Sequence, residues 1–196
     1  MSDRRATFYF DLSSPYAYLA ALRVDEVLPV ESTWQPIAFG ALIREIGKVP
    51  WSLRDETRAA GQAEIAQRAR ERGLPPVRWP PGWPAESYSV VPLRALLHAF
   101  DAGRGKELSF ELYRLEFVEG VALDDLDVIA AAADTCGLDG ERLRAAVEEP
   151  EIKQRLRAAT DDALRRGITG VPTVDVGDEL FWGDDRLEDA AIALAA

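Results

Sequence analysis

Ser14 is the side chain of this sequence that is best placed to do chemistry. It lies in the stretch "FYFDLSSPYAYLA", residues 8–20, where an apolar strand-like run changes into a helix-like run within a few residues. A serine at such a junction can cap the new helix, and the following Pro15 suits the first helical position. The stretch by itself leaves two interpretations open: Ser14 only caps the helix, or its hydroxyl has a further role.

One cysteine and one histidine limit the other chemistry available to the chain. Cys136, in "DTCGLD", has no second cysteine with which to form a disulfide or a metal cluster, and we expect it to be a small buried residue at a helix end. His98, in "RALLHAF", lies on a helical apolar pattern. A Ser-His-Asp hydrolase is disfavoured because this histidine belongs to a distant helical segment and the sequence has no Gly-x-Ser-x-Gly turn. We expect no bound metal.

Composition and charge exclude several broad classes of function. The chain has 196 residues, 47% hydrophobic and 29% charged, which is typical of one globular domain or a domain carrying an insertion. Its net charge of −11 opposes binding to a nucleic-acid backbone. No apolar run approaches the roughly 20 residues of a membrane helix, and the start "MSDRRATFYF" does not resemble a secretion signal. We therefore expect a cytoplasmic protein that binds neither nucleic acid nor a membrane.

The first part of the chain predicts a β-α-β unit followed by helices. Residues 6–10 alternate as a strand, residues 15–28 carry apolar side chains at helical spacing, and "STWQPIAF" indicates a second strand. A short helical piece at 41–48 and a polar helix at 53–73 come next. These elements therefore predict a β-α-β unit that is followed by a long helical stretch.

A proline-rich stretch, "PPVRWPPGWP", interrupts the helices and predicts an extended loop. Its two tryptophans, Trp79 and Trp83, either cover the mouth of an apolar pocket or pack against the domain surface. Four further helices are predicted after it, at 92–102, 105–119, 126–136 and 138–147.

The C-terminal segment predicts a β-β-α unit. A helix ends at Gly167, and "TVDV" and "ELFW" indicate two strands joined by a tight turn at Gly177-Asp178. Pro172 stands at the head of the first of these strands, where it cannot donate to a sheet, and it is a candidate for a cis peptide bond. Asp184 or Asp185 is expected to cap the terminal helix.

Together these elements predict an α/β protein, a thioredoxin-like fold with a large all-helical insertion. We expect residues 1–40 and 155–196 to form the thioredoxin-like domain and residues 41–154 to form the inserted helical domain. Four stretches resemble the DsbA-like thioredoxin superfamily, in the branch that includes 2-hydroxychromene-2-carboxylate isomerase and the kappa-class glutathione transferases. They are "FYFDLSSPYAYLA", "FVEGVALDDLDVIAAAADTCGLD", "GITGVPT" and "DELFWGDDRLED".

The resemblance implies a catalytic role for Ser14. In this family the serine at the start of the first helix holds the thiol of bound glutathione and favours its thiolate form. The redox members of the superfamily carry a Cys-x-x-Cys pair at the same turn. Here the four residues are Ser14, Pro15, Tyr16 and Ala17, so the resemblance does not extend to disulfide exchange.

The resemblance also implies a binding site for glutathione. Val171, just before Pro172, would pair its backbone with the cysteinyl unit of the peptide. The γ-glutamyl end would meet the segment that holds Trp182, Asp184, Asp185 and Arg186. Asp185 would bind the ammonium group, and Arg186 with the helix N-terminus would bind the carboxylate. An alternative stays open, because Asp185 and Glu188 have the spacing of a capping box and could simply start the helix.

The implied activity is that of a glutathione-dependent isomerase, in which the bound thiolate adds reversibly to an aromatic conjugated carbonyl compound. Tyr16, Trp51, Trp79 and Trp83 are the candidate substrate-binding residues, and the family is commonly dimeric. The sequence departs from the isomerase pattern at Asp184, where a neutral residue is expected, at Leu53 in place of an asparagine, and at Gln67-Arg68 in place of Arg-Trp. The alternatives are a kappa-like glutathione transferase and a thiol-binding protein without catalysis.

Overall fold

The computed structural model describes residues 5–177 and 179–196 and contains a four-stranded sheet in the order β2-β1-β3-β4. β1 (Ala6–Phe10) runs parallel to β2 (Ser32–Pro36), and it pairs in antiparallel fashion with β3 (Thr173–Asp175), which in turn pairs with β4 (Leu180–Trp182). The sheet therefore joins the two ends of the sequence: Phe8 of β1 lies opposite Trp34 on one side and Val174 on the other.

The central strand β1 is buried because both faces of the sheet are covered. Phe8 and Phe10 are stacked 5.5 Å apart between ring centroids in the main core, which they share with side chains of the helical region. Tyr9 points to the other face and packs in a smaller cluster with Ile37, Leu42, Ala163, Ile168 and Val171. Successive side chains of a strand alternate between faces, so a strand covered on both sides reads as a nearly continuous apolar run.

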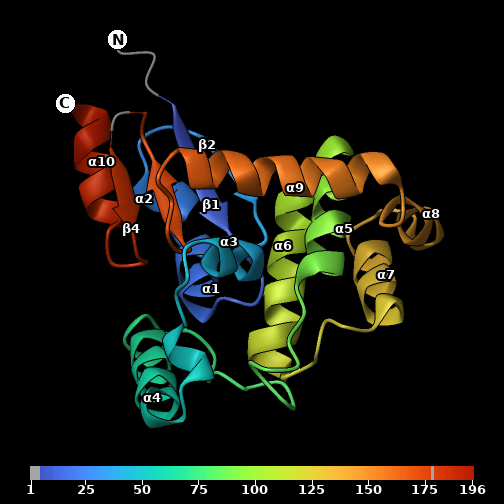
Figure 1. Ribbon diagram of the computed structural model, residues 1–196, viewed down its shortest axis with the longest axis horizontal. Helices are drawn as coiled ribbons and strands as arrows, with labels where there is room; N and C mark the ends of the chain where they lie inside the picture. The colour runs from blue at the N-terminus through green and yellow to red at the C-terminus, as the bar shows by residue number, and fades with distance from the viewer. Residues whose placement is uncertain (1–4, 178) are drawn as a thin grey trace.

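Three helices lie next to the strands in the sequence: α1 (Pro15–Ala21) and α2 (Val24–Val27) connect β1 to β2, and α10 (Leu187–Ala195) follows β4. α10 packs on α2 and β4. The other helices lie between β2 and β3 in the sequence. They are α3 (Phe39–Glu45), the short η1 (Trp51–Leu53), α4 (Asp55–Glu71), α5 (Val90–Asp101), α6 (Gly105–Arg114) with the π-helical η2 (Leu115–Glu119), α7 (Leu126–Thr135), α8 (Gly140–Ala146) and α9 (Pro150–Arg165). Figure 1 shows α5 to α8 grouped on one side of the sheet, with α9 running from the sheet across this group, and α4 set apart from it. The division at residues 40 and 155 stays a prediction, although residue 155 lies inside the continuous helix α9.

Several element predictions need correction. The helix expected at 15–28 is two helices, because the chain turns at Leu22 and Arg23, where Arg23 N–H bonds to the Ala20 carbonyl. The helix expected at 105–119 ends in π-helical turns. The proline-rich stretch is extended only as far as Pro80 and then turns. The described part of the chain contains no helix that is long and apolar enough to cross a membrane.

The predicted caps of the terminal helix are wrong. The residue before α10 is Arg186, which makes no side-chain cap hydrogen bond. Asp184 is instead buried and paired with arginines, which removes its carboxylate from the helix end. The β3–β4 pair is confirmed, but Asp178 of the predicted turn lies outside the described residues.

Candidate active site

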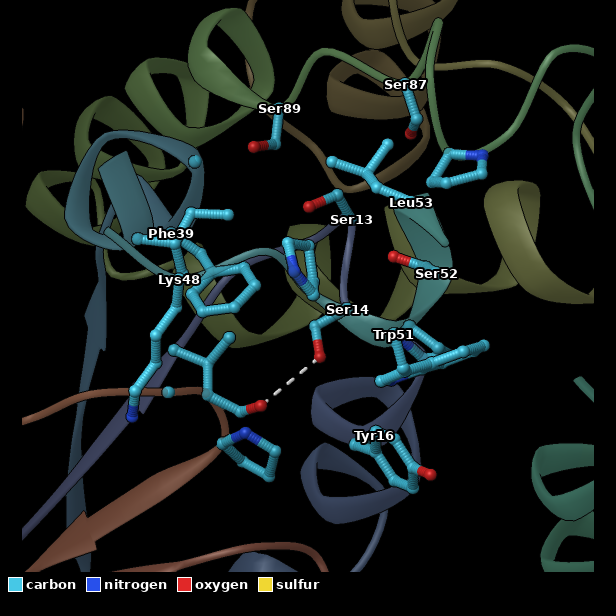
Figure 2. A pocket seen from close by; sticks show the side chains of 18 of the residues that line it. Ser13, Ser14, Tyr16, Phe39, Lys48, Trp51, Ser52, Leu53, Ser87 and Ser89 are labelled. Carbon is cyan, nitrogen blue, oxygen red and sulfur yellow. Dashed lines mark hydrogen bonds between the residues drawn. The ribbon is translucent and has the colours of Figure 1, made fainter. Parts of the chain in front are cut away.

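A cavity of about 770 Å³ opens beside the start of α1. It lies between the end of the sheet, helices α3 and α4, and the segment that precedes α5 (Figure 2). Cavities of about 300–1,000 Å³ are typical of small-molecule sites, so this one can hold a ligand of substantial size. The predicted site residues that line it are Ser14, Tyr16, Trp51, Trp83, Val171, Pro172, Trp182, Asp184 and Asp185. Trp79 and Arg186 are not among its lining residues.

Ser14 does cap α1, as its sequence position predicts. Its Oγ accepts a hydrogen bond of 3.2 Å from the Ala17 N–H. The same hydroxyl donates to the Val171 carbonyl, but this second bond is long, at 3.4 Å (Figure 2). Hydrogen bonds weaken as they lengthen beyond the usual 2.5–3.0 Å for O–H···O. The proton of Ser14 is therefore weakly held and can turn to a stronger acceptor in the cavity.

Val171 and Pro172 line the cavity beside Ser14, whose hydroxyl bonds to the Val171 carbonyl. The peptide bond between them is cis, as the candidate position in the sequence indicated. Both residues are buried. The Gly183 N–H donates a hydrogen bond of 3.0 Å to the Pro172 carbonyl, which connects this part of the lining to the segment before α10.

Three aromatic side chains form an apolar wall. Trp51 lies 6.0 Å from the Tyr16 ring and 5.9 Å from the Trp83 ring, measured between centroids. Gly61 of α4 allows this arrangement, because a Cβ atom there would lie 2.2 Å from the Trp51 ring. The Trp79 ring lies 4.3 Å from the Trp83 ring between centroids, tilted by 42°, and packs on the core. One tryptophan of the proline-rich stretch therefore faces the cavity and the other packs on the domain.

Tyr16 stays protonated over the ordinary pH range. Burial raises the pKa of its phenol to about 12, and the charge of the nearby Glu64 contributes to the rise. The Arg68 guanidinium lies 5.4 Å from the centre of the ring, in position for a cation–π contact. Tyr16 can therefore act as a neutral hydrogen-bond donor, but not as a base.

Asp184 makes a buried ion-pair network that the sequence did not reveal. Its carboxylate lies 2.6 Å from Arg68 Nη1 and 2.5 Å from Arg72 Nη2. The Arg68 guanidinium also lies 2.6 Å from Glu64 and 3.7 Å from Asp185. Two arginines, Arg68 of α4 and Arg72 directly after it, therefore already engage the Asp184 carboxylate.

Of the remaining predicted residues, all in the segment before α10, some line the cavity and one does not. Asp185 lines the cavity with its side chain 59% exposed, so its carboxylate is accessible. Trp182 is also exposed at the cavity edge, where Lys48 Nζ lies 5.8 Å from its ring. Arg186 points away, forms an ion pair with Asp189 and lies over the Phe181 ring.

Sequence reasoning missed several lining residues. Arg44 and Lys48, on and after α3, bring positive charge to the cavity, and Ser13, Ser87 and Ser89 bring hydroxyl groups. The serine doublet in "LSSP" was a signal for Ser13. The others come from segments whose sequence carries no recognisable motif.

Neither Cys136 nor His98 lines the cavity. Cys136 is half-buried at the end of α7, and burial raises the pKa of its thiol. Within the described ranges, no group of three or more histidine, cysteine, aspartate or glutamate side chains could hold a metal ion.

A family model described as a DSBA-like thioredoxin domain matches residues 6–195, nearly the whole chain. The chain belongs to the DsbA-like thioredoxin family. The predicted family and the predicted fold class are both confirmed, because the mixed four-stranded sheet with its inserted helices is the DsbA-like fold.

Two curated relatives and one solved structure extend the comparison. A 2-hydroxychromene-2-carboxylate isomerase of Sphingobium xenophagum is 27% identical over 92% of this chain and 93% of the relative. Human glutathione S-transferase kappa 1 is 22% identical over 94% of this chain and 88% of the relative. A solved structure of a 2-hydroxychromene-2-carboxylate isomerase superposes with a TM-score of 0.86 at 21% identity, covering 97% of this chain and 94% of that one. This DsbA-like chain is therefore related to isomerase and glutathione transferase enzymes.

Proposed function

We propose that this protein is a glutathione-dependent isomerase that acts on an aromatic conjugated carbonyl compound. The observation that carries the proposal is the state of the Ser14 hydroxyl, whose oxygen accepts from the Ala17 N–H while its own proton makes only a 3.4 Å bond to the Val171 carbonyl. A thiolate in the cavity is a stronger acceptor than that carbonyl. Because α1 has only seven residues, the hydroxyl rather than the helix dipole supplies the main stabilisation of the thiolate.

The neighbouring backbone supports a peptide ligand. Among the described residues, the Val171 N–H has no hydrogen-bond partner. It can pair with the cysteinyl unit of glutathione, as an extended peptide does at a free strand edge. The exposed Asp185 carboxylate can bind the γ-glutamyl ammonium group, and the guanidinium of Arg68, which also lines the cavity, can bind the γ-glutamyl carboxylate. Arg68 thus takes the role expected of Arg186, which does not line the cavity.

The proposed reaction uses the thiolate as a reversible nucleophile. The sulfur adds to the β carbon of the conjugated carbonyl compound, and the electron pair of the double bond moves to the carbonyl oxygen. The former double bond then rotates as a single bond. When the carbon–sulfur bond breaks, the electrons return, the rearranged double bond forms and the thiolate is regenerated. The aromatic wall of Tyr16, Trp51 and Trp83 would hold the ring of this substrate.

Binding is tested by differential scanning fluorimetry with millimolar glutathione and with S-methylglutathione, which has the same peptide but no ionisable thiol. We expect glutathione to raise the Tm by several degrees and the methylated peptide to raise it clearly less. Equal shifts would remove the thiolate from the proposal. If neither ligand shifts the Tm, the thiol-binding role fails altogether.

Catalysis is tested with cis-benzalacetone, an aromatic conjugated ketone. We expect conversion to the trans isomer, measured by absorbance, with no net loss of free thiol. The kappa-like transferase alternative, which the similarity to the human enzyme supports, predicts consumption of glutathione instead, for example with chlorodinitrobenzene. Binding of glutathione without either reaction would leave the alternative of a non-catalytic binding protein.

We also propose that the protein works in the cytoplasm as a homodimer. Cytoplasmic thiols are kept reduced, which the mechanism requires. Sedimentation equilibrium measures the assembly state directly, and a monomer at micromolar concentration would contradict the dimer.

A further inference from the structure

Three serine hydroxyls gather at one end of the cavity, apart from Ser14. They belong to Ser13, which precedes α1, and to Ser87 and Ser89, which precede α5, and all three are partly exposed. Figure 2 shows the three side chains in the part of the cavity away from the Ser14 hydroxyl, which bonds to the Val171 carbonyl. The proposed thiol chemistry makes no use of this serine cluster.

The buried carboxyl group of Asp11 accepts hydrogen bonds from groups at this end of the cavity. The Ser13 N–H and the Ser13 Oγ both donate to Asp11 Oδ1 at 2.9 Å, and the Phe39 N–H donates to Oδ2 at 2.8 Å. Ser89 also lies near this carboxyl group and lowers its pKa, whereas burial, the larger effect, raises it. Asp11 is fully buried, so these donors are the groups that compensate its desolvation.

A second buried acid, Glu116 on η2, accepts a hydrogen bond from the Ser87 hydroxyl. Ser87 Oγ donates to Glu116 Oε1 at 2.9 Å, and within the described part of the chain the other oxygen, Oε2, is buried without a hydrogen-bond partner. Burial raises the pKa of Glu116 well above its usual value. With Glu116 Oε1 as its acceptor, Ser87 directs its proton inward.

The consequence is a polar wall that only accepts hydrogen bonds. A serine hydroxyl has one proton and two lone pairs, and in Ser13 and Ser87 the proton is directed to a buried carboxyl group. The lone pairs are left for the cavity. Ether and carboxylate oxygens have no proton to offer such a wall, whereas a group with several O–H or N–H donors satisfies it.

We propose that the serine cluster is a subsite for vicinal hydroxyl groups on the second substrate, next to the aromatic wall that holds its ring. The inference deepens the proposed function, on which it rests for the identity of the cavity as the active site. It adds the substrate class: an aromatic compound with adjacent hydroxyl donors rather than one whose oxygens are alkylated.

Catechol and its dimethyl ether are the probes, because they share the ring and differ only in the two protons. Their Kd values are measured by ligand-observed NMR, first without glutathione and then at saturating glutathione. We expect catechol to bind at least about fivefold more tightly, as two added hydrogen bonds would give. Equal affinities for the two probes without glutathione would overturn the subsite even if glutathione binds, and a preference without any glutathione binding would overturn only the proposed function.

Single substitutions test which serine side chains cause the preference for catechol over its dimethyl ether. Ser87→Ala and Ser89→Ala should each reduce the catechol preference at least about twofold, and Ser87→Thr, which keeps the hydroxyl, should restore it. Ser52→Ala is the matched control, because Ser52 lines the same cavity but no bond from its hydroxyl to a buried carboxyl group is found among the described residues. Loss of the preference in Ser52→Ala, or its persistence in both alanine variants of the cluster, would contradict the proposal. An alanine variant that fails to fold is replaced by its glycine counterpart, which also lacks the hydroxyl group.

Discussion

Arg68 and Asp184 lie 116 positions apart in the sequence, and their side chains meet at 2.6 Å beside the cavity. This contact ties α4 to the segment before α10. Because Arg68 also lies against Tyr16 and near Asp185, the ion pair positions the part of the cavity that we assign to the γ-glutamyl end of glutathione. We therefore propose that Asp184 positions Arg68 and that Asp185 is the acid that binds the ligand.

The first prediction concerns Asp184→Ala. Removing this carboxylate leaves Arg68 and Arg72 without their buried partner, and breaking a buried pair in this way is strongly destabilising. Because both arginines are partly exposed, at 24% and 21%, we expect a loss of about 2–3 kcal/mol in the free energy of unfolding, measured with urea. A loss below about 0.5 kcal/mol, the size of an ordinary surface substitution, would contradict the positioning role.

Asp185→Ala should leave stability nearly unchanged and weaken the binding of glutathione. Its side chain is exposed, so we expect the free energy of unfolding to change by no more than about 0.5 kcal/mol. The KM or Kd for glutathione should rise at least about tenfold, through loss of a charge-assisted hydrogen bond. Arg186→Ala is the matched control, since Arg186 is adjacent but does not line the cavity. A larger effect on glutathione from Arg186 than from Asp185 would reverse the assignment.

Ser14→Ala should separate capping from catalysis. Loss of the cap costs about 1 kcal/mol, and loss of the thiolate donor should lower turnover by roughly ten- to a thousandfold. Asp139→Ala provides the control, because Asp139 caps α8 through the Arg142 N–H at 3.0 Å, far in sequence from the site. We expect it to lose similar stability and to keep full turnover in the cis-benzalacetone assay. If Ser14→Ala loses stability only, Ser14 is simply a cap.

The parts of the fold that follow from local sequence were predictable. β1 could be inferred because a strand buried on both faces reads as an apolar run, and the start of α1 because Ser14 and Pro15 are strong helix-start signals. Pro172 likewise indicated the head of a strand. The break at Leu22 was not predictable from local sequence. At this point the Arg23 side chain donates to the Asp184 carbonyl at 3.4 Å, and this contact depends on the tertiary fold.

The candidate site was predictable to the extent that a family motif marked it. Ser14, Val171 and Asp185 were found in this way, and all three line the cavity. Arg68 was noted only as a departure from the family pattern, because the sequence gives no measure of its distance from Asp184. The link from Ser87 to Glu116 joins a loop to η2 and has no periodic pattern by which it could be recognised.

Gly61→Ala should disturb the aromatic wall. A Cβ atom there would lie 2.2 Å from the Trp51 ring, so the ring must move, and such overpacking costs about 1–3 kcal/mol. We expect weaker binding of catechol dimethyl ether, which depends on the wall alone. Gly40→Ala in α3 is the comparison, because no atom lies within 4 Å of the new Cβ, and alanine there should add up to about 1 kcal/mol of stability. Unchanged ether binding in Gly61→Ala would show that Trp51 does not hold the ring.

Glu116→Gln tests the buried acid behind the serine cluster through the pH dependence of stability. In the folded protein burial raises the pKa of Glu116 well above 4.5, so the unfolded chain loses this proton first as the pH rises. The stability that the neutral acid contributes is complete below the unfolded pKa and is lost as the pH rises toward the folded pKa. Glutamine has no proton to lose and keeps an acceptor for Ser87, so the variant should gain stability relative to wild type between pH 5 and pH 8.

Glu111→Gln, on the adjacent α6, is the control with the opposite sign. A hydrogen bond from Arg114 lowers the pKa of Glu111, so its contribution is present above the unfolded pKa and is lost as the pH falls through the folded value. That variant should therefore lose stability relative to wild type at pH 8, and the loss should shrink toward pH 4. Urea titrations of the three proteins across this range measure both trends. A Glu116→Gln difference that stays constant with pH would mean that Glu116 is not kept neutral, and the proton on Ser87 would then be held by a buried carboxylate instead.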